Sequence, residues 1–595
     1  GVLAMLRLAS SIAVAAVPEG LPVVATTTLA LGVTKMRREG ILVRRLAAVE
    51  TLGEVQTICL DKTGTLTENR MALVAVDTGA GAAAPSGADA THRRLLATAV
   101  RASEAQIGPD GAWDEADGSA TERALLDGAR ALGLDIGELF RAAPRRAFVG
   151  RTEAAPLVVS LHEAGDDGEQ VAVKGSPAAV LARASHVRQN GEVRALTDDD
   201  RAALVGANDA LGGRGLRVLA VAEGDGRDAA DEKRLVWLGL TGLADPLRPG
   251  MAAALARFRR AGAATVIVTG DQTGTAYAIA KELDLAEGRP LRVLDAGDMA
   301  RLDRGAFAAL AARTDVFARV SPAQKLEIVR ALQDAGRVVA MTGDGINDSP
   351  ALKAADVGIA MGRAGTEAAR ATVDIVLETD DIAGLATAIA EGRAIYDNIR
   401  RSVDFLLATN LSEIGLTAGA TLAGLPQPLT PVQLLWLNIV SDVFPALGLA
   451  VDPPSPDVLE RPPRRPDAPL LSASRLRVRA REGAVITAAA LLAHRLATGR
   501  YGATPQARTL TLSTLVLAQL LHAWVVRPKG RARNRTLDLA VLGTLALQAA
   551  APVIPGFARA LGVTRPAAGD LALALGLGGG ACLVNRLWPR GTEED

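Results

Sequence analysis

The stretch DKTGTLT at Asp61–Thr67 directly follows TICL, an apolar run of the kind that forms a buried strand. An aspartate in this position lies at the carboxyl end of a strand, where open parallel sheets present their ligands. The alternative is an aspartate that merely caps a turn before Gly64, and the length of the motif argues against it. The stretch therefore predicts an α/β domain with Asp61 in its site.

Three later stretches extend this pattern. TGDQTGTA begins at Thr269 after the strand-like run TVIV, and MTGDGINDSPAL occupies 341–352. FARVSPAQK places Lys325 in a helical pattern, and because a lone lysine on a helix is usually solvated, only the surrounding motif favours a functional role. No GxxxxGK occurs in the sequence, so a Walker-type phosphate loop is not expected.

With these stretches in this order, the chain resembles a P-type cation-transporting ATPase of the calcium-pump branch, truncated at its N-terminus. The resemblance covers nearly the whole chain from Gly1 to the last helices. It implies an α/β cytosolic part, in which a haloacid-dehalogenase-like Rossmann phosphorylation domain carries an inserted α+β nucleotide-binding domain. An all-α transmembrane helix bundle completes the expected fold.

The resemblance implies that Asp61 takes the γ-phosphoryl group of ATP and that Lys325 offsets the charge on the transferring phosphate. In-line transfer to a carboxylate gathers negative charge, so a metal and cations must neutralise it. Mg²⁺ prefers hard oxygen ligands, and the resemblance assigns it Asp61, Thr63 and Asp344. The implied catalytic residues are Asp61, Lys62, Thr63, Thr269, Gly270, Asp271, Lys325, Asn347 and Asp348.

A nucleotide site is implied within the insertion. VKGSP at Lys174 resembles the KGAPE motif, and GSATERAL at 118–125 resembles GEATE, with Glu122 placed to accept from the adenine amino group. Phe148 would stack on adenine, although a lone phenylalanine is more often a core residue. Ser119 and Glu153 depart from the family pattern and leave ATP affinity open. The implied nucleotide-binding residues are Glu122, Phe148, Lys174, Arg217, Asp245 and Arg248.

A cation site is expected between membrane helices. In VAAVPEGLP, Pro18 cannot donate to the carbonyl of Val14, so carbonyls are freed beside Glu19 in the middle of an apolar segment. Oxygen ligands of this kind suit Ca²⁺, and Mn²⁺ would also accept them. The CPC motif of copper and zinc pumps is absent. The expected ligands are Val14, Ala15, Val17, Glu19, Asn410, Glu413, Asn438, Ser441 and Asp442.

Composition fits a protein that lies partly in a lipid bilayer. Apolar residues make up 49% of the 595 residues and charged residues 22%, with a formal net charge of zero. The balanced charge gives no reason to expect a nucleic-acid partner, and two distant cysteines support neither a disulfide framework nor a cysteine metal site. Seven apolar spans are predicted, at 2–34, 402–422, 432–450, 483–499, 507–526, 536–556 and 567–588.

The predicted organisation follows from these spans and motifs. Lys35, Arg37 and Arg38 after the first span place the region that follows in the cytosol, in a multi-pass protein of the plasma membrane. The predicted parts are a membrane helix at 1–34, a phosphorylation domain at 35–74 and 244–382, a nucleotide-binding domain at 75–243, a stalk at 383–401 and six membrane helices at 402–595.

The expected function is ATP-driven transport of a divalent cation, Ca²⁺ in the first place, out of the cytosol. The sequence holds no TGE segment, no actuator domain and no first three helices of the family, so that portion is expected in cis or in trans. The rival hypotheses are a non-pumping fragment or pseudo-pump, a membrane-tethered phosphohydrolase, and a Mn²⁺ or monovalent-cation pump. Because 507–530 contains no acidic residue, one Ca²⁺ per cycle is expected, with a cation such as His522, Arg527 or Lys529 neutralising Glu413.

Overall fold

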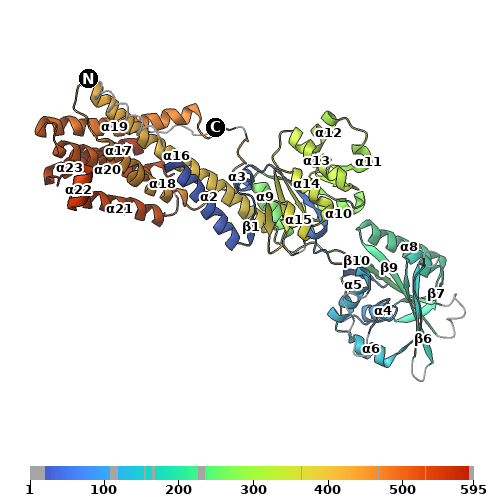
Figure 1. Cartoon of the computed structure of the whole chain (residues 1–595). Helices are drawn as coiled ribbons and strands as arrows, with labels where there is room; N and C mark the ends of the chain where they lie inside the picture. Colours follow the sequence, from blue (N-terminus) through green and yellow to red (C-terminus); the bar gives the residue numbers. More distant parts are fainter. Residues whose placement is uncertain are drawn as a thin grey trace. The chain divides into compact units, whose positions relative to one another are not determined.

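A computed structural model describes residues 20–107, 118–152, 156–163, 168–189, 191–225, 235–363, 365–466, 468–528 and 531–588, except for the side chain at 346. The chain divides into two compact units (Figure 1). We call the first the helical unit; it comprises Gly1–Gln56, Arg257–Ala264 and Asp374–Asp595. The second, the α/β unit, comprises Thr57–Ala256 and Thr265–Val373.

A parallel sheet of buried strands forms one half of the α/β unit. Its strands follow the order β15-β14-β2-β11-β13-β12. Strands β2 and β14 are buried at every position, as expected for a sheet covered on both faces. The bounds are β2 Thr57–Asp61, β11 Ala264–Val268, β12 Val293–Asp295, β13 Val316–Ala318, β14 Val339–Gly343 and β15 Val357–Met361. The helices of this region are α9 Met251–Arg260, α10 Thr273–Glu282, α11 Ala296–Met299, α12 Arg304–Ala311, α13 Pro322–Asp334, α14 Ser349–Ala354 and α15 Glu367–Thr372.

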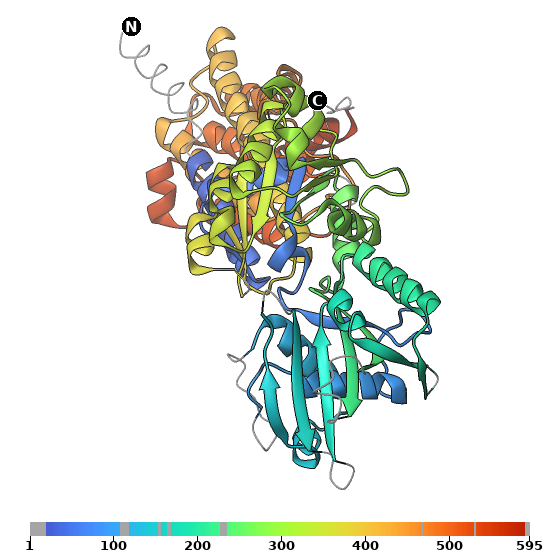
Figure 2. The same ribbon diagram turned by 90° about the vertical axis from the view of Figure 1, so that its right-hand side faces the viewer.

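A second, mainly antiparallel sheet lies between β2 and β11 in the sequence. Its order is β4-β5-β6-β9-β10-β7-β8, with β3 paired to β10, and Figure 2 shows its strands side by side. The strand bounds are β3 Ala72–Asp77, β4 Arg145–Val149, β5 Leu157–Glu163, β6 Glu169–Gly175, β7 Ala184–Gln189, β8 Glu192–Ala195, β9 Arg217–Asp225 and β10 Leu235–Ala244. The helices are α4 Ala90–Arg101, α5 Ala120–Ala131, α6 Ile136–Ala142, α7 Pro177–Leu181 and α8 Asp198–Gly213.

Helices cover both faces of this second sheet because side chains alternate along a strand. On β9, Ala220 and Ala222 join a core cluster with residues of α7 and α8. Val221, between them, joins a cluster with residues of α4 and α5 on the opposite face. The insertion therefore has a core of its own on each side of the sheet.

The helical unit is a bundle with one small antiparallel strand pair. Strand β1 (Ile41–Val43) pairs with β16 (Ile375–Leu377). A single helix, α16, runs without interruption from Ala383 to Leu422, so the predicted stalk and the predicted span at 402–422 belong to one element. The other helices are α2 Gly20–Arg38, α3 Ala47–Glu54, α17 Pro431–Trp436, α18 Val443–Ala450, α19 Ala473–Tyr501, α20 Pro505–Val526, α21 Arg535–Ala550, α22 Pro555–Leu561 and α23 Ala568–Leu587.

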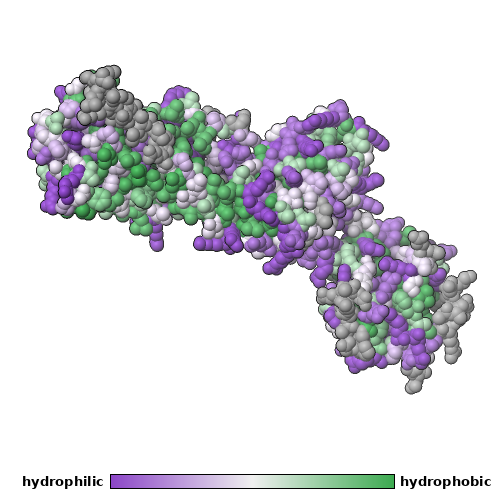
Figure 3. Space-filling view, viewed as in Figure 1, coloured by the Kyte–Doolittle hydropathy of each residue, from purple (hydrophilic) through white to green (hydrophobic). Residues whose placement is uncertain are grey.

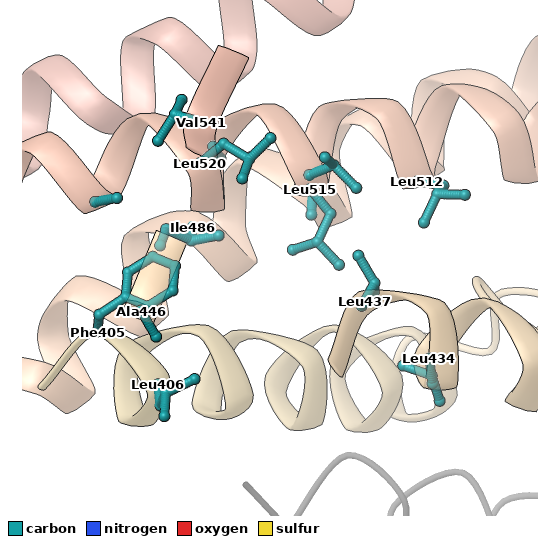
Figure 4. Close-up of a cluster of buried hydrophobic side chains, with 14 of the residues drawn as sticks. Phe405, Leu406, Leu434, Leu437, Ala446, Ile486, Leu512, Leu515, Leu520 and Val541 are labelled. Carbon is teal, nitrogen blue, oxygen red and sulfur yellow. The ribbon is translucent and has the colours of Figure 1, made fainter. Parts of the chain in front are cut away.

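Apolar side chains hold the bundle together and cover much of its surface. The core joins Phe405 and Leu406 of α16 to residues of α17, α18, α19, α20 and α21 (Figure 4). In Figure 3, hydrophobic residues cover much of the visible face of the helical unit, whereas hydrophilic residues dominate the α/β unit. Such a surface suits helices surrounded by lipid.

Three helical segments of the described chain are long and apolar enough to cross a membrane. They are Pro431–Ala450, Pro505–Val526 and Ala568–Leu587, and a fourth results if α21 and α22, bent by 91°, form one span. The predicted spans at 402–422 and 483–499 are helical within α16 and α19 but do not pass this test. The span at 2–34 lies largely outside the described residues. An α/β part together with an all-helical part agrees with the expected fold class, while the predicted domain boundaries stay predictions.

Candidate active site and cation site

Asp61 is the last residue of β2 and lies at the edge where neighbouring strands also end. Strand β14, parallel to β2, is followed by Asp344, and β11, on the other side of β2, is followed by Thr269. The carboxyl ends of adjacent parallel strands meet at one edge of a sheet. Asp61, Asp344 and Asp348 thus come together, and one oxygen from each lies within 4.8 Å of the others.

Lys325 joins two of these carboxylates. Its Nζ lies 2.6 Å from Asp61 Oδ1 and 2.6 Å from Asp348 Oδ1. Ser321 caps α13 with a capping box to Gln324, and Pro322 follows at the first helical position, so the helix begins at a fixed point. Lys325 therefore extends from the first turn of α13 and is buried, which the sequence pattern by itself did not favour.

Burial and crowding change the acidity of this cluster. Burial raises the pKa of Asp61 to about 7; Lys325 counteracts this rise, and the negative charge of Asp348 adds to it. Burial, followed by the charge of Asp348, also raises the pKa of Asp344. Burial acts to lower the pKa of Lys325, but the charges of Asp61 and Asp348 outweigh it and the pKa is raised. Additional positive charge at this edge would therefore favour three ionised carboxylates.

The turn after Asp61 is fixed by close packing. Gly64 has φ +70°, and a Cβ there would lie 2.1 Å from Asp344 Oδ2. Arg248 Nη2 donates to the carbonyl of Gly64 at 2.9 Å, and Thr67 Oγ1 donates to Asp245 Oδ2 at 2.5 Å. Arg248 and Asp245, predicted as nucleotide-binding, thus contact the phosphorylation motif itself.

The remaining predicted catalytic residues differ in their contacts and in how exposed their side chains are. Lys62 Nζ lies 2.6 Å from Asp271 Oδ2, and Asp271 N donates to Thr269 Oγ1 at 3.1 Å. Thr63 and Asn347 have exposed side chains in the structure. Gly270 lines a cleft of about 1580 Å³ together with Lys62 and Asp271. The catalytic roles of all these residues stay predictions.

The predicted nucleotide residues form two groups within the α/β unit. Glu122 and Lys174 make a buried ion pair, 2.6 Å between Oε2 and Nζ, while Phe148 keeps 40% of its surface exposed. Arg217 and Asp245 instead line the large cleft. None of Glu122, Lys174 and Phe148 is among the described residues that line it. The pattern of the sequence did not reveal this separation.

The predicted cation ligands of α16 and of the helix after it are buried in the helical unit. Residues Leu437–Asp442 form a π-helical turn between α17 and α18, not the regular α-helix that the spacing predicts. Such turns often occur at functional sites. Among the described residues, Asn410 Oδ1, Glu413 Oε2 and Asp442 Oδ1 accept no hydrogen bond. Asn438 and Ser441 are also buried, whereas Val14, Ala15, Val17 and Glu19 lie outside the described residues.

Two neighbours of these carboxylates were missed from the sequence. Thr409 Oγ1 donates to Asp442 Oδ2 at 2.8 Å, and Gln519 Nε2 donates to Glu413 Oε1 at 3.1 Å. A lone polar residue in an apolar span was the only available signal. The prediction that a cation neutralises Glu413 is wrong for His522, because His522 Nε2 lies 3.4 Å from Glu482 Oε2 instead. It is also wrong for Arg527, which donates to Asp452 at 2.8 Å, and Lys529 lies outside the described residues.

Family models match three parts of the chain. The model for the C-terminus of cation transporting ATPases matches residues 426–590, and that for P-type ATPase cytoplasmic domain N matches residues 91–250. A model for haloacid dehalogenase-like hydrolases matches residues 327–389. The matched regions and the two sheets define an α/β unit of the haloacid-dehalogenase type with an inserted second domain, which confirms the expected fold class.

Curated relatives extend the similarity along the chain. A calcium-transporting ATPase of Bacillus subtilis is 36% identical over 570 residues, covering 90% of this chain and 63% of the relative. A probable cation-transporting ATPase F of Mycobacterium tuberculosis is 36% identical, covering 89% and 61%, and the calcium-transporting ATPase type 2C member 2 of Mus musculus is 33% identical, covering 98% and 64%. The chain thus spans under two thirds of these relatives. It belongs to the family of P-type cation-transporting ATPases.

Proposed function

We propose that this chain carries the catalytic and cation-binding part of a pump that moves Ca²⁺ out of the cytosol at the expense of ATP. Asp61 would be phosphorylated in each cycle. The observation that carries the proposal is the cluster of Asp61, Asp344 and Asp348 at the carboxyl ends of β2 and β14, with Lys325 paired to Asp61 and Asp348. Relatives named as calcium-transporting ATPases support Ca²⁺ as the cargo.

The donor set of the cluster fits Mg²⁺. Asp61 and Asp344 offer carboxylate oxygens, which are the hard ligands that this ion takes alongside phosphate, and Thr63 would add a third group. The ion would neutralise the charge that gathers when phosphate approaches a carboxylate. Asp61 would act as the nucleophile, and Lys325 would hold it in place while balancing the charge of Asp348.

The proposed cargo site joins α16 to the π-helical turn. Glu413 and Asp442 each present an oxygen that accepts no hydrogen bond from the described residues, in the interior of an apolar bundle. Buried carboxylates in a membrane protein are costly unless a cation or proton meets them. The further parts of the proposal are a location in the cell membrane and an actuator portion, in cis or in trans, that supplies the group for hydrolysis of the phosphoenzyme.

Labelling with γ-labelled ATP and Mg²⁺ tests the proposed nucleophile. The full chain is expected to form an acid-stable, hydroxylamine-labile phosphoenzyme, and Asp61→Asn should carry no label. Asp298→Asn, a change at an exposed aspartate of α11, is the matched control and should label normally. Equal labelling of Asp61→Asn and the unmodified chain would refute the assignment.

A further inference from the structure

Arg145 begins β4 and lies against two aromatic rings of the inserted domain. Its guanidinium carbon is 4.9 Å from the centre of the Phe148 ring and 5.4 Å from that of Phe140. A guanidinium near an aromatic ring at this distance is attracted by the quadrupole of the ring. Because Phe148 remains 40% exposed, Arg145 restrains a ring that can still contact a ligand.

The same guanidinium also holds the loop after α4. Its Nη2 donates to the carbonyl of Arg101 at 3.0 Å and to the carbonyl of Ser103 at 2.9 Å. Ser103 Oγ in turn donates to Glu122 Oε2 at 2.8 Å, and Lys174 Nζ donates to the same oxygen at 2.6 Å. One side chain therefore connects the exposed Phe148 ring to the loop that orients the Glu122 carboxylate.

The electrostatics agree with this arrangement. Burial lowers the pKa of the Arg145 guanidinium, and the negative charge of Glu122 counteracts that lowering, so the two groups influence one another. The next residue, Arg146, differs in every respect. It is exposed and pairs with Glu163, and the register of β4 against β5 shifts between Arg145 and Ala147, so regular alternation of side chains does not hold here. Only one of the two adjacent arginines faces the ring and the loop.

We propose that Arg145 is a positioning residue that makes the nucleotide site selective for adenine over guanine. It holds the Phe148 ring against the face of the base and, through Ser103, holds Glu122 at the edge of the base. Adenine presents an amino group where guanine presents a carbonyl oxygen, and an ionised carboxylate can only accept a hydrogen bond. This inference rests on the proposed use of ATP and on the nucleotide site predicted at Glu122, Phe148 and Lys174.

The test compares nucleotide binding by the full chain with Arg145→Met, Arg145→Lys and Arg146→Met. For Arg145→Met we expect the Kd for ATP to rise about tenfold, as a cation–π contact and hydrogen bonds to a loop are lost. The Kd for GTP should rise less, because stacking on Phe148 serves either base whereas the contact with Glu122 serves adenine alone. Arg145→Lys keeps the positive charge but loses the forked donor geometry of the guanidinium group. We therefore expect an ATP-to-GTP selectivity between those of the unmodified chain and Arg145→Met. Arg146→Met should match the unmodified chain.

The outcomes separate this inference from the proposed function. An unmodified chain that binds neither ATP nor GTP overturns both. An unmodified chain that prefers ATP, with the same ATP-to-GTP ratio in Arg145→Met, overturns only the role of Arg145. Ser103→Ala removes the hydrogen bond to Glu122, together with the one that Ser103 Oγ accepts from Ala105 N, and leaves Arg145 in place. It should also lower the ratio, so it decides the question if Arg145→Met does not fold. An unchanged ratio in Ser103→Ala would then count against the proposal.

Discussion

At the scale of single residues, the chemistry of the α/β unit depends on one buried cation between two carboxylates. Lys325 contacts both Asp61 and Asp348, and removing it would leave two negative charges facing one another in a buried cluster. The sequence motifs place Asp61 at the end of a strand and Lys325 near the start of a helix. The contact itself depends on α13 packing against β14, the strand that neighbours β2.

Lys325→Met should lower the rate of phosphoenzyme formation about 100-fold, the scale of losing one charge-stabilising donor from a site that accumulates negative charge. The Kd for ATP should remain within a few-fold of the unmodified value, because the predicted nucleotide residues Glu122, Phe148 and Lys174 belong to the inserted sheet and its helices. Rapid-quench labelling with γ-labelled ATP measures the rate. The control is Lys353→Met, at an exposed lysine of α14, and equal rates in both variants would contradict the assigned role of Lys325.

At the scale of elements, glycines set how closely α16 and α19 approach. A Cβ at Gly483 would lie 2.9 Å from the carbonyl oxygen of Ala408 and 3.1 Å from Leu411 Cβ. Small residues at such positions let membrane helices pack closely. Gly499, on the same helix α19, has no atom within 4 Å of its would-be Cβ. The two glycines look alike in the sequence and differ only in their surroundings.

Gly483→Ala should destabilise the protein by about 1–3 kcal/mol through overpacking, less the modest gain that alanine brings to a helix. Gly499→Ala should leave stability unchanged or raise it by up to about 1 kcal/mol, since only the helix propensity changes. The thermal unfolding midpoint of the detergent-solubilised full chain measures both. A downward shift of equal size in the two variants would show that the contact with α16 is not the cause.

At the scale of the whole molecule, the proposed pump would have to relate a cation bound in one unit to a phosphate bound in the other. Glu413 and Asp442 belong to the helical unit, and Asp61 belongs to the α/β unit. The number of cations bound per phosphorylated Asp61 is therefore a property of the complete chain and not of either unit alone. Within the described part of the chain, the neutral amide of Gln519 donates to Glu413.

We expect one tightly bound Ca²⁺ per phosphorylatable Asp61 in the assembled pump. The stretch 507–530 contains no acidic residue, and the amide of Gln519 beside Glu413 adds no charge for a second divalent cation. Gln519→Glu should allow a second ion, because the added carboxylate would repel Glu413 unless a cation lies between them. Equilibrium binding of labelled Ca²⁺, normalised to phosphoenzyme, gives the ratio. Two tight ions in the unmodified pump would overturn the expectation.

The sequence by itself determined the local features of the protein. Buried strand patterns before Asp61 and Thr269 predicted the parallel sheet, and long apolar runs predicted helices, because both signals arise from neighbours in the chain. Tertiary structure decided which distant groups meet: Lys325 with Asp61, Gln519 with Glu413 and Arg145 with the carbonyl of Ser103. It also decided that α16 is one helix and that 437–442 forms a π-helical turn. The physical reason is that side-chain contacts between segments far apart in sequence depend on how elements pack, which no local pattern encodes.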